Sequence, residues 1–299
     1  MIITVSEDDA SIRIDKYLSD HDSAHSRSNI QKAIRSGQCK VNGAIVRDSY
    51  MVKKNDVIEF KLPDPVEAEI VPENIPLDIL YEDDDVLVVN KPKDMVVHPA
   101  PGHLGSTLVN AIMYHCGDSL SGINGVMRPG IVHRIDKDTT GSLIICKNDY
   151  SHRFIAEQIK EHTVNRIYLG IVHGRTEPDG TIDKPIGRNP SDRKKMAVNT
   201  VNGKRAVTHY KTIKQSSRFS FCKFRLETGR THQIRVHMAS IGHPLLGDSV
   251  YGPAKCPVSG LQGQTLHAWK IGFIHPGTGE YMEFTAPVPD YMMDLIRKI

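Results

Sequence analysis

The segment from residue 131 to residue 145 gathers more ionisable side chains than a folded turn requires. It reads Ile-Val-His-Arg-Ile-Asp-Lys-Asp-Thr-Thr-Gly-Ser-Leu-Ile-Ile, and its charged or titratable members are His133, Arg134, Asp136, Lys137 and Asp138. Apolar residues flank this polar insert, which ends in a turn-like Thr-Thr-Gly, so the pattern predicts a loop between two strands. A carboxylate on such a loop could act as a nucleophile or a general acid or base. A solvated charged loop would have the same composition, and the segment alone leaves both interpretations open.

Two other segments carry side chains that could assist such a carboxylate. In the strand-like run 166–172, alternation places the apolar residues on one face and leaves Arg166 and Tyr168 on the other. Arg230 stands where the chain turns into a helix-like segment. A nucleophilic aspartate in a partly dehydrated pocket needs a nearby cation to stay ionised, and Arg230 is the candidate for Asp136. The structural alternatives are sheet packing for Tyr168 and a pair with any nearby carboxylate for Arg230.

The histidines and cysteines do not show the spacing of a metal site. The chain has 15 histidines, but His133, His232, His237 and His267 show no ligand spacing with cysteine or carboxylate, and the H-E-x-x-H pattern is absent. The five cysteines are far apart and include no C-x-x-C pair, which is typical of reduced thiols in a cytosolic protein. Neither a phosphate loop nor a dinucleotide fingerprint is present. We therefore expect neither a bound metal nor a cofactor.

The bulk composition is compatible with several classes of partner. With 39% hydrophobic and 24% charged residues the chain resembles an ordinary soluble protein, and a net charge of +3 permits nucleic acid as a partner without requiring it. The N-terminus carries acidic residues where a signal peptide would be apolar, and no segment is apolar for long enough to span a bilayer. We expect a cytoplasmic monomer with no membrane contact.

Residues 12–61 have the pattern of a small basic unit. The run 26–37 has apolar residues at helical spacing, a serine at its start and a glycine after its last turn, which predicts a short capped helix. Asn-Gly at 42–43 predicts a hairpin, and residues 56–60 a strand. Three basic side chains fall outside the apolar arc of the helix: Arg27, Lys32 and Arg35. They could bind an anionic partner or be ordinary solvated charges.

A proline-rich stretch separates this unit from the rest of the chain. Four prolines between residues 62 and 76 indicate an extended linker, so we expect domains at 1–62 and 77–299 joined by 63–76. In the larger domain, strand-like runs outnumber the helices expected at 151–160, at 231–240 and from residue 290. Strands and helices do not alternate regularly, which favours an α+β fold over a doubly wound parallel sheet.

The motifs of the larger domain resemble those of one enzyme family. His133 to Gly141 closely resembles the HRLDKDTSG signature of the RluA/RluD family of pseudouridine synthases. Four further blocks look like family motifs: Asn90-Lys91-Pro92 with Val97-His98-Pro99, Asn165 to Tyr168, Gly229 to His237, and Leu266 to Trp269. Residues 12–60 are similar to an S4 RNA-binding domain. Three positions depart from the commoner Leu, Ser and Leu of the signature: Ile135, Thr140 and Ser142. Nothing in the sequence explains Ser142.

The resemblance implies a fold and a role for each candidate residue. It implies a catalytic domain with a central mixed, mainly antiparallel β-sheet flanked by helices and loops, beside a small S4-like α/β domain. Asp136 would be the nucleophile, Arg134 would help displace the target base, and Arg230 would pair with Asp136. Tyr168 would stack on uracil and act in the later proton removal. The basic helix would contact phosphates through Arg27, Lys32 and Arg35. The implied substrate is RNA, of the large-subunit (23S-type) ribosomal class or a ribosomal precursor.

Two other classes of function remain as alternatives. A glycoside hydrolase also attacks an anomeric carbon, but it requires a second carboxylate, and Asp138 is too close in sequence to Asp136 to be assigned that part. A non-catalytic RNA-binding protein would explain the first domain, which is only about a fifth of the chain. A non-catalytic protein would not explain why Asp136, Tyr168 and Arg230 occur in one chain.

Overall fold

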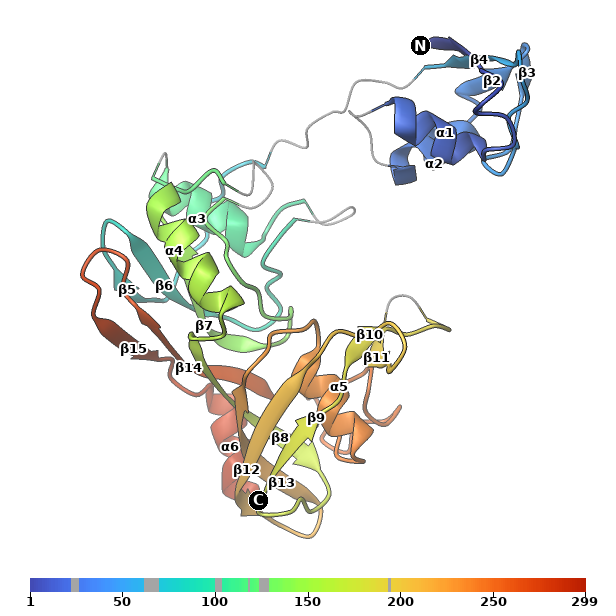
Figure 1. Ribbon diagram of the computed structural model, residues 1–299. Coiled ribbons are helices and arrows are strands. Elements are labelled where there is room, and N and C mark those ends of the chain that lie inside the picture. The colour runs from blue at the N-terminus through green and yellow to red at the C-terminus, as the bar shows by residue number, and fades with distance from the viewer. Residues whose placement is uncertain (23–26, 62–69, 100–103, 118, 124–128, 193–194) are drawn as a thin grey trace. The chain divides into compact units, whose positions relative to one another are not determined.

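The computed structural model describes all residues except 23–26, 62–69, 100–103, 118, 124–128 and 193–194. The chain forms two compact units, Met1–Ala68 and Glu69–Ile299, each with a core of its own (Figure 1). The first half of the expected linker lies outside the described residues. Its second half packs in the larger unit, because Ile70 is a buried member of that core and Glu73 accepts a hydrogen bond from the Ser106 backbone N–H at 2.9 Å.

The first unit packs two helices against a four-stranded antiparallel sheet. The helices are α1 (Ile14–His21) and α2 (Arg27–Arg35), and the strand order is β1 (Ile2–Thr4), β4 (Val57–Phe60), β2 (Cys39–Val41) and β3 (Ala44–Ile45). The expected hairpin is confirmed, since Asn42 and Gly43 join β2 to β3 with φ angles of 51° and 79°. Two positive φ angles are what this tight turn needs, and Asn-Gly adopts them readily.

A nine-stranded sheet forms the centre of the second unit. Its order is β5 (Ile79–Glu82), β6 (Val86–Lys91), β7 (Thr140–Cys146), β14 (Leu266–Ile274), β8 (Asn165–His173), β13 (Phe219–Leu226), β12 (Val207–Gln215) and β9 (Asp179–Asp183), with β15 (Tyr281–Thr285) also paired to β14. Among the described strands, β7 and β14 form the one parallel pair. The expected mixed, mainly antiparallel sheet is confirmed. A separate two-stranded sheet joins β10 (Ile186–Arg188) to β11 (Met196–Val198).

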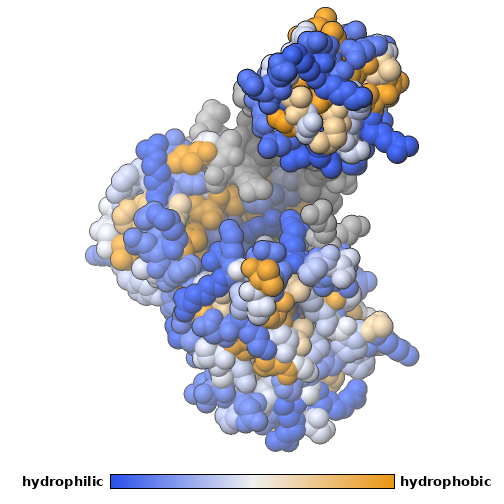
Figure 2. Space-filling model, turned by 45° about the vertical axis from the view of Figure 1, so that its right-hand side comes forward, coloured by the Kyte–Doolittle hydropathy of each residue, from blue (hydrophilic) through white to orange (hydrophobic). Residues whose placement is uncertain are grey.

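Helices cover both faces of the large sheet. On one face α3 (Leu108–Cys116) and α5 (Gln233–Ser240) contribute to a core with Leu87, Leu143 and Tyr168. On the other, α4 (Asp149–Lys160) packs on alternate residues of β6 and β7, and α6 (Asp290–Lys298) packs on β8 and β13. The helices expected at 151–160, at 231–240 and from 290 are confirmed, whereas α3 is not among them. No described helix has both the length and the apolar character needed to cross a membrane. Hydrophilic side chains cover much of the face seen in Figure 2.

The pairing of β7 with β14 explains why glycine occupies position 141 and serine position 142. The expected turn at Thr-Thr-Gly is wrong, because Thr140 and Gly141 already belong to β7. Gly141 has a φ of 109°, and a Cβ there would lie on the backbone of Ala268, so the close approach requires glycine. Ser142 is buried and donates a hydrogen bond from Oγ to the Ala268 carbonyl at 2.9 Å. A serine at this position therefore satisfies a buried acceptor.

Candidate active site

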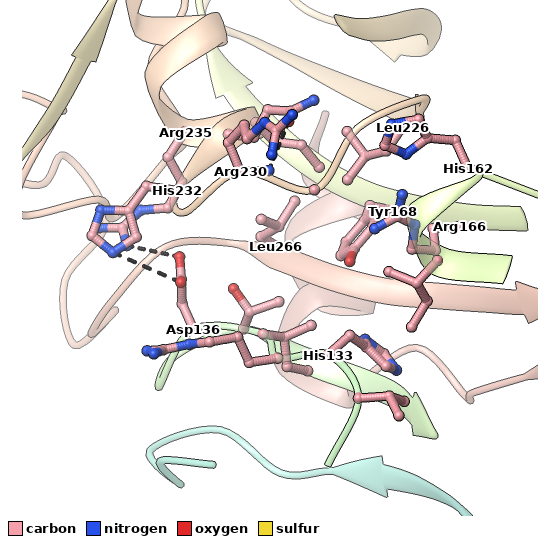
Figure 3. A pocket seen from close by; sticks show the side chains of 18 of the residues that line it. His133, Asp136, His162, Arg166, Tyr168, Leu226, Arg230, His232, Arg235 and Leu266 are labelled. Carbon is pink, nitrogen blue, oxygen red and sulfur yellow. Dashed lines mark hydrogen bonds and ion pairs between the residues drawn. The ribbon is translucent and has the colours of Figure 1, made fainter. Parts of the chain in front are cut away.

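A cavity of about 530 Å³ lies in the second unit. Its walls come from segments far apart in the sequence, namely the loop 132–139, the end of α4 with His162 two residues beyond it, strand β8, the stretch 226–235 that leads into α5, and Leu266 at the start of β14. Figure 3 shows side chains from all of these segments directed toward one space. The structure thus brings together the four candidate residues of this unit: Arg134, Asp136, Tyr168 and Arg230.

A buried lysine anchors the loop that carries Asp136. Lys91, at the end of β6, is 1% exposed and donates hydrogen bonds from Nζ to the carbonyls of Pro92, Met95 and Lys137 at 2.7–2.9 Å. The last of these acceptors is the residue after Asp136. Burial lowers the pKa of Lys91 to about 7, although nearby aspartates favour its charged form. The loop is therefore tied to the sheet one residue from its carboxylate.

The Asp136 carboxylate is paired with Arg235. Its Oδ2 accepts a hydrogen bond from Nη1 of Arg235 at 2.9 Å, and Arg235 in turn binds Asp248 through Nε at 2.7 Å. Burial alone would lower the pKa of Arg235, but the hydrogen bond to Asp248 and the charges of both carboxylates raise it. Burial would raise the pKa of Asp248, yet the same guanidinium holds it below its usual value. Asp136 thus faces a cation that remains charged.

The expected pairing of Arg230 with Asp136 is wrong. Arg230 lines the cavity, but its Nε donates to the carbonyl of Arg205 at 3.0 Å. The reason is the path of the chain between the two arginines. His232 adopts a left-handed conformation with a φ of 57°, so α5 begins two residues later than expected and presents Arg235 to the carboxylate. Arg235 lies in the same motif block as Arg230, so the sequence did offer it as a candidate partner of Asp136. The residue at which α5 begins decides which of the two arginines reaches the carboxylate.

His232 is a second neighbour of Asp136 that the sequence patterns did not single out. Its Nε2 lies 3.7 Å from Oδ1 of Asp136, and its Nδ1 lies 2.8 Å from the hydroxyl of Tyr251. The Tyr251 oxygen accepts a hydrogen bond from the backbone N–H of Met196 at 2.9 Å, which leaves its own hydrogen for Nδ1. This arrangement favours the tautomer with a hydrogen on Nε2, directed at the carboxylate. The pKa of His232 is lowered, and burial of the imidazole is the largest cause.

Tyr168 lies on the other side of the cavity from Asp136 (Figure 3). As alternation predicts, it shares a face of β8 with Arg166, while Leu169 and Ile171 pack under α6. Tyr168 is 8% exposed, and burial raises the pKa of its phenol although the Arg166 charge lowers it. The phenol is therefore protonated in the free protein at neutral pH.

The remaining candidates differ in their surroundings. Arg134 is an exposed residue that also lines the cavity. In the first unit, Arg27, Lys32 and Arg35 are all exposed on α2, but Arg27 binds the buried Asp15 at 3.0 Å and Arg35 binds Asp48. Lys32 has no ion pair within the described part of the chain, so the basic character of this helix is weaker than the sequence alone indicates. No group of histidine, cysteine or carboxylate side chains among the described residues could hold a metal ion.

Comparisons with known proteins agree across the whole chain. The family described as "RNA pseudouridylate synthase" matches residues 85–240, and "S4 domain" matches residues 12–58. A Bacillus subtilis (strain 168) protein named "Uncharacterized RNA pseudouridine synthase YlyB" is 52% identical over 298 residues, covering 99% of this chain and 97% of its own. The Zymomonas mobilis "Ribosomal large subunit pseudouridine synthase D" is 47% identical over 307 residues, covering 99% and 96%.

A solved structure supports the same conclusion for the second unit. "Human RNA Pseudouridylate Synthase Domain Containing 1" superposes with a TM-score of 0.58 at 26% identity, covering 75% of this chain and 86% of that one. All but one of the residues that line the cavity lie within the matched region 85–240, and they include the aspartate of the HRID segment. This chain therefore belongs to the RluA family of RNA pseudouridine synthases and carries an S4 RNA-binding domain in its first unit.

Proposed function

We propose that this enzyme converts specific uridines of large-subunit ribosomal RNA into pseudouridine, with Asp136 as the nucleophile. Relatives from Zymomonas mobilis and Vibrio vulnificus, 47% and 40% identical over nearly the full chain, are named for the ribosomal large subunit, which supports this class of substrate. The enzyme would act in the cytoplasm as a monomer, as its sequence leads us to expect.

The reaction needs a nucleophile but no oxidant, reductant or energy source. The Asp136 carboxylate would attack C1′ of the target uridine, forming a C1′–O bond while the C1′–N1 bond breaks and the pair of electrons stays on uracil. The base turns, C5 bonds to C1′ and the carboxylate is released. The proton on C5 is then removed, and N1 gains one, so that the product is an isomer of the substrate.

One observation carries the nucleophile assignment. Asp136 is the single carboxylate among the described residues that line the cavity, and it is held there by Arg235. A carboxylate fixed by a charged arginine is suited to attack an anomeric carbon. A glycoside hydrolase would need a second carboxylate in the cavity. Asp248, the nearest other carboxylate of this network, is fully buried against Arg235 and cannot reach a substrate.

The other residues of the cavity have separate roles in this proposal. Arg134, exposed beside Asp136, would occupy the place of the extruded base. Tyr168 would stack on uracil, pass its own proton to N1 and then accept the proton from C5. Arg235, rather than Arg230, would hold the Asp136 carboxylate in place for attack. Arg230 lines the same cavity with only its Nε engaged by a carbonyl, which supports a contact with RNA.

The proposal is tested first by the variant Asp136→Asn, which keeps the volume of the side chain and removes its nucleophilicity. We expect turnover of ribosomal RNA to fall by at least about 10³-fold, with binding preserved. Asp94→Asn is the matched control, because Asp94 is an exposed carboxylate paired with Lys137 on the same loop, and it should keep wild-type turnover. Activity of Asp136→Asn above a few per cent of wild type would contradict the assignment.

The substrate is tested in cells that lack the gene. Pseudouridines are mapped in large-subunit ribosomal RNA before and after the gene is restored as wild type or as Asp136→Asn. Sites that disappear with the gene and return only with wild type would establish the substrate. An unchanged ribosomal map, with losses in another RNA, would overturn the ribosomal part and leave the family assignment intact.

A further inference from the structure

Arg166 is a buried cation in the cavity that has no partner within the described part of the protein. It lies in β8, is 6% exposed and lines the cavity. Its Nε and Nη2 are both buried and make no hydrogen bond, and it takes part in no ion pair with a described residue. A buried guanidinium without an acceptor is costly, because water no longer solvates the charge. An arginine in this state therefore requires an explanation.

Arg235 lines the same cavity and, unlike Arg166, has carboxylate partners for its charge. It is buried to the same extent, 6% exposed, yet it contacts two carboxylates, Asp136 and Asp248. The pKa of Arg235 is raised by these partners, whereas burial lowers the pKa of Arg166 and no carboxylate offsets the effect. The fold thus compensates one of the two charges and leaves the other uncompensated.

The surroundings of Arg166 are cationic or neutral. Lys160, His162 and Arg230 line the same cavity, and the charges of Arg166 and Arg230 add to burial in lowering the pKa of His162. Burial, followed by the Arg166 charge, lowers the pKa of His133 to about 3, so this imidazole is neutral. A Cβ on Gly229 would lie 2.5 Å from Nη1 of Arg166, which means that the chain passes close to the guanidinium without covering it with a side chain.

We propose that Arg166 binds a phosphodiester of the RNA next to the target uridine and so forms a phosphate subsite inside the active-site cavity. The proposal rests on RNA being the substrate. Uracil and ribose are neutral, and the phosphodiesters are the anions that RNA brings into the cavity. The planar fork of an arginine matches two phosphate oxygens, and such charge-assisted bonds are the strong ones. Binding the phosphate would give the guanidinium the anionic partner that the described part of the protein does not supply, and would fix the flanking backbone while the base is turned.

The test is a double-mutant cycle between the protein and the RNA. Full-length wild type and Arg166→Met are compared on a uridine-containing ribosomal RNA oligonucleotide in which each flanking phosphate in turn is a neutral methylphosphonate. For wild type we expect at least about a tenfold loss of affinity at one of the two positions, about 1.4 kcal/mol. For Arg166→Met the same replacement should have no further effect. Additive losses at both positions would overturn the proposal.

Arg205→Met is the matched control of the cycle. Arg205 is an exposed arginine that is already paired with Glu227 and does not line the cavity. Removing it should leave the response to methylphosphonate as large as in wild type. Should Arg205→Met also abolish that response, the coupling would reflect general charge rather than a subsite at Arg166.

A second measurement does not depend on RNA. Since Arg166 is unpaired in the free enzyme, Arg166→Met should unfold at the same temperature as wild type or higher, whereas Arg235→Met should unfold at a lower temperature. A lower Tm for Arg166→Met would show that this arginine is needed by the free fold and would contradict the proposal. Arg166→Lys, which keeps the charge and loses the fork, is measured in the same binding cycle and should show a weaker response to methylphosphonate than wild type.

Failure of the phosphate subsite and failure of the proposed substrate give different results. If ribosomal RNA is not the substrate, neither wild type nor variant converts the oligonucleotide, and the binding cycle still reports on Arg166. If only the subsite is wrong, wild type converts the oligonucleotide and the losses are additive.

Discussion

Asp248 binds two nitrogens of the Arg235 guanidinium, Nε at 2.7 Å and Nη2 at 3.0 Å, and leaves Nη1 free to reach Asp136. Asp248 is itself held by the backbone N–H groups of Val250 and Tyr251 at 2.9 and 3.1 Å. The orientation of the arginine is thus set by a residue outside the cavity. Asp248 is a positioning residue in this arrangement, acting on Asp136 only through Arg235.

Asp248→Asn should reduce turnover more than it reduces RNA binding. Loss of the carboxylate frees Arg235 to move, and a misplaced Asp136 should lower kcat by about 10²-fold with KM nearly unchanged. The variant should also change the response to acid. The pKa of Asp248 is lowered in the fold, so its contribution to stability is present above its unfolded pKa near about 4 and is lost as the pH falls through the folded value.

This acid response is measured as the free energy of unfolding in denaturant between about pH 2.5 and pH 6, the range that spans a lowered carboxyl pKa. Asp248→Asn should lose less stability over this range than wild type. Asp179→Asn, at an exposed position of β9, is the control and should behave as wild type. Identical pH dependence in all three proteins would argue against the ion pair.

Lys91 should make the enzyme more stable in mildly alkaline solution. Its pKa in the fold is lowered to about 7, so between about pH 7 and pH 10 the unfolded chain binds more protons than the folded one and stability rises with pH. Lys91→Met should remove this rise while also weakening the anchor of the loop at Lys137. Wild type and variant with the same slope would show that the Lys91 amine titrates normally.

Tyr168→Phe should separate stacking from proton transfer. The ring remains to stack on uracil, but no hydroxyl is available for the C5 proton, so RNA whose base is already joined through C5 but still carries that proton should accumulate in place of product. The measurement is a single-turnover time course in which loss of uridine and formation of pseudouridine are quantified separately. Product formation at the wild-type rate would make the hydroxyl dispensable.

Arg134→Ala should affect paired targets more than unpaired ones. Its exposed side chain lies beside Asp136 at the cavity, where it can fill the space left by an extruded base. Turnover is compared for the same uridine in a duplex and in a single strand. The loss should be larger in the duplex, and equal losses would exclude a role in extrusion.

The first unit should contribute affinity rather than chemistry. Because Ile70 packs in the second core, the truncation that preserves this core removes residues 1–68. This truncated enzyme should need more RNA and show a flatter salt dependence of binding. Lys32→Gln should reduce the salt slope by about 0.7–0.9, as expected for one phosphate contact. Lys54→Gln, at a lysine already paired with Glu7, should leave the slope unchanged. Undiminished affinity of the truncated enzyme would exclude a role in RNA capture.

Local chemistry explains which features could be predicted from the sequence. The Asn42-Gly43 hairpin follows from the φ angles that those residues tolerate, and the cavity face of β8 follows from alternation along the strand. Turn chemistry and strand alternation could not show that Arg235, rather than Arg230, is the partner of Asp136. The bond between Arg235 and Asp136 joins residues 99 positions apart, and the left-handed turn at His232 sets which arginine the helix presents. Ser142 is explained only by an acceptor 126 residues further on.

The pairing of β7 with β14 also has a consequence for the timing of activity during synthesis. The strand that follows the Asp136 loop meets its parallel neighbour only at His267 and Ala268, near the end of the chain. While the nascent polypeptide is still emerging, β7 can pair with β6, but Gly141 and Ser142 lack the Ala268 backbone on their other side and Asp136 lacks Arg235. The first unit can fold and engage RNA as soon as it leaves the ribosome, because domains fold as units from the N-terminus. Each newly made molecule would thus be able to bind RNA well before it could modify it.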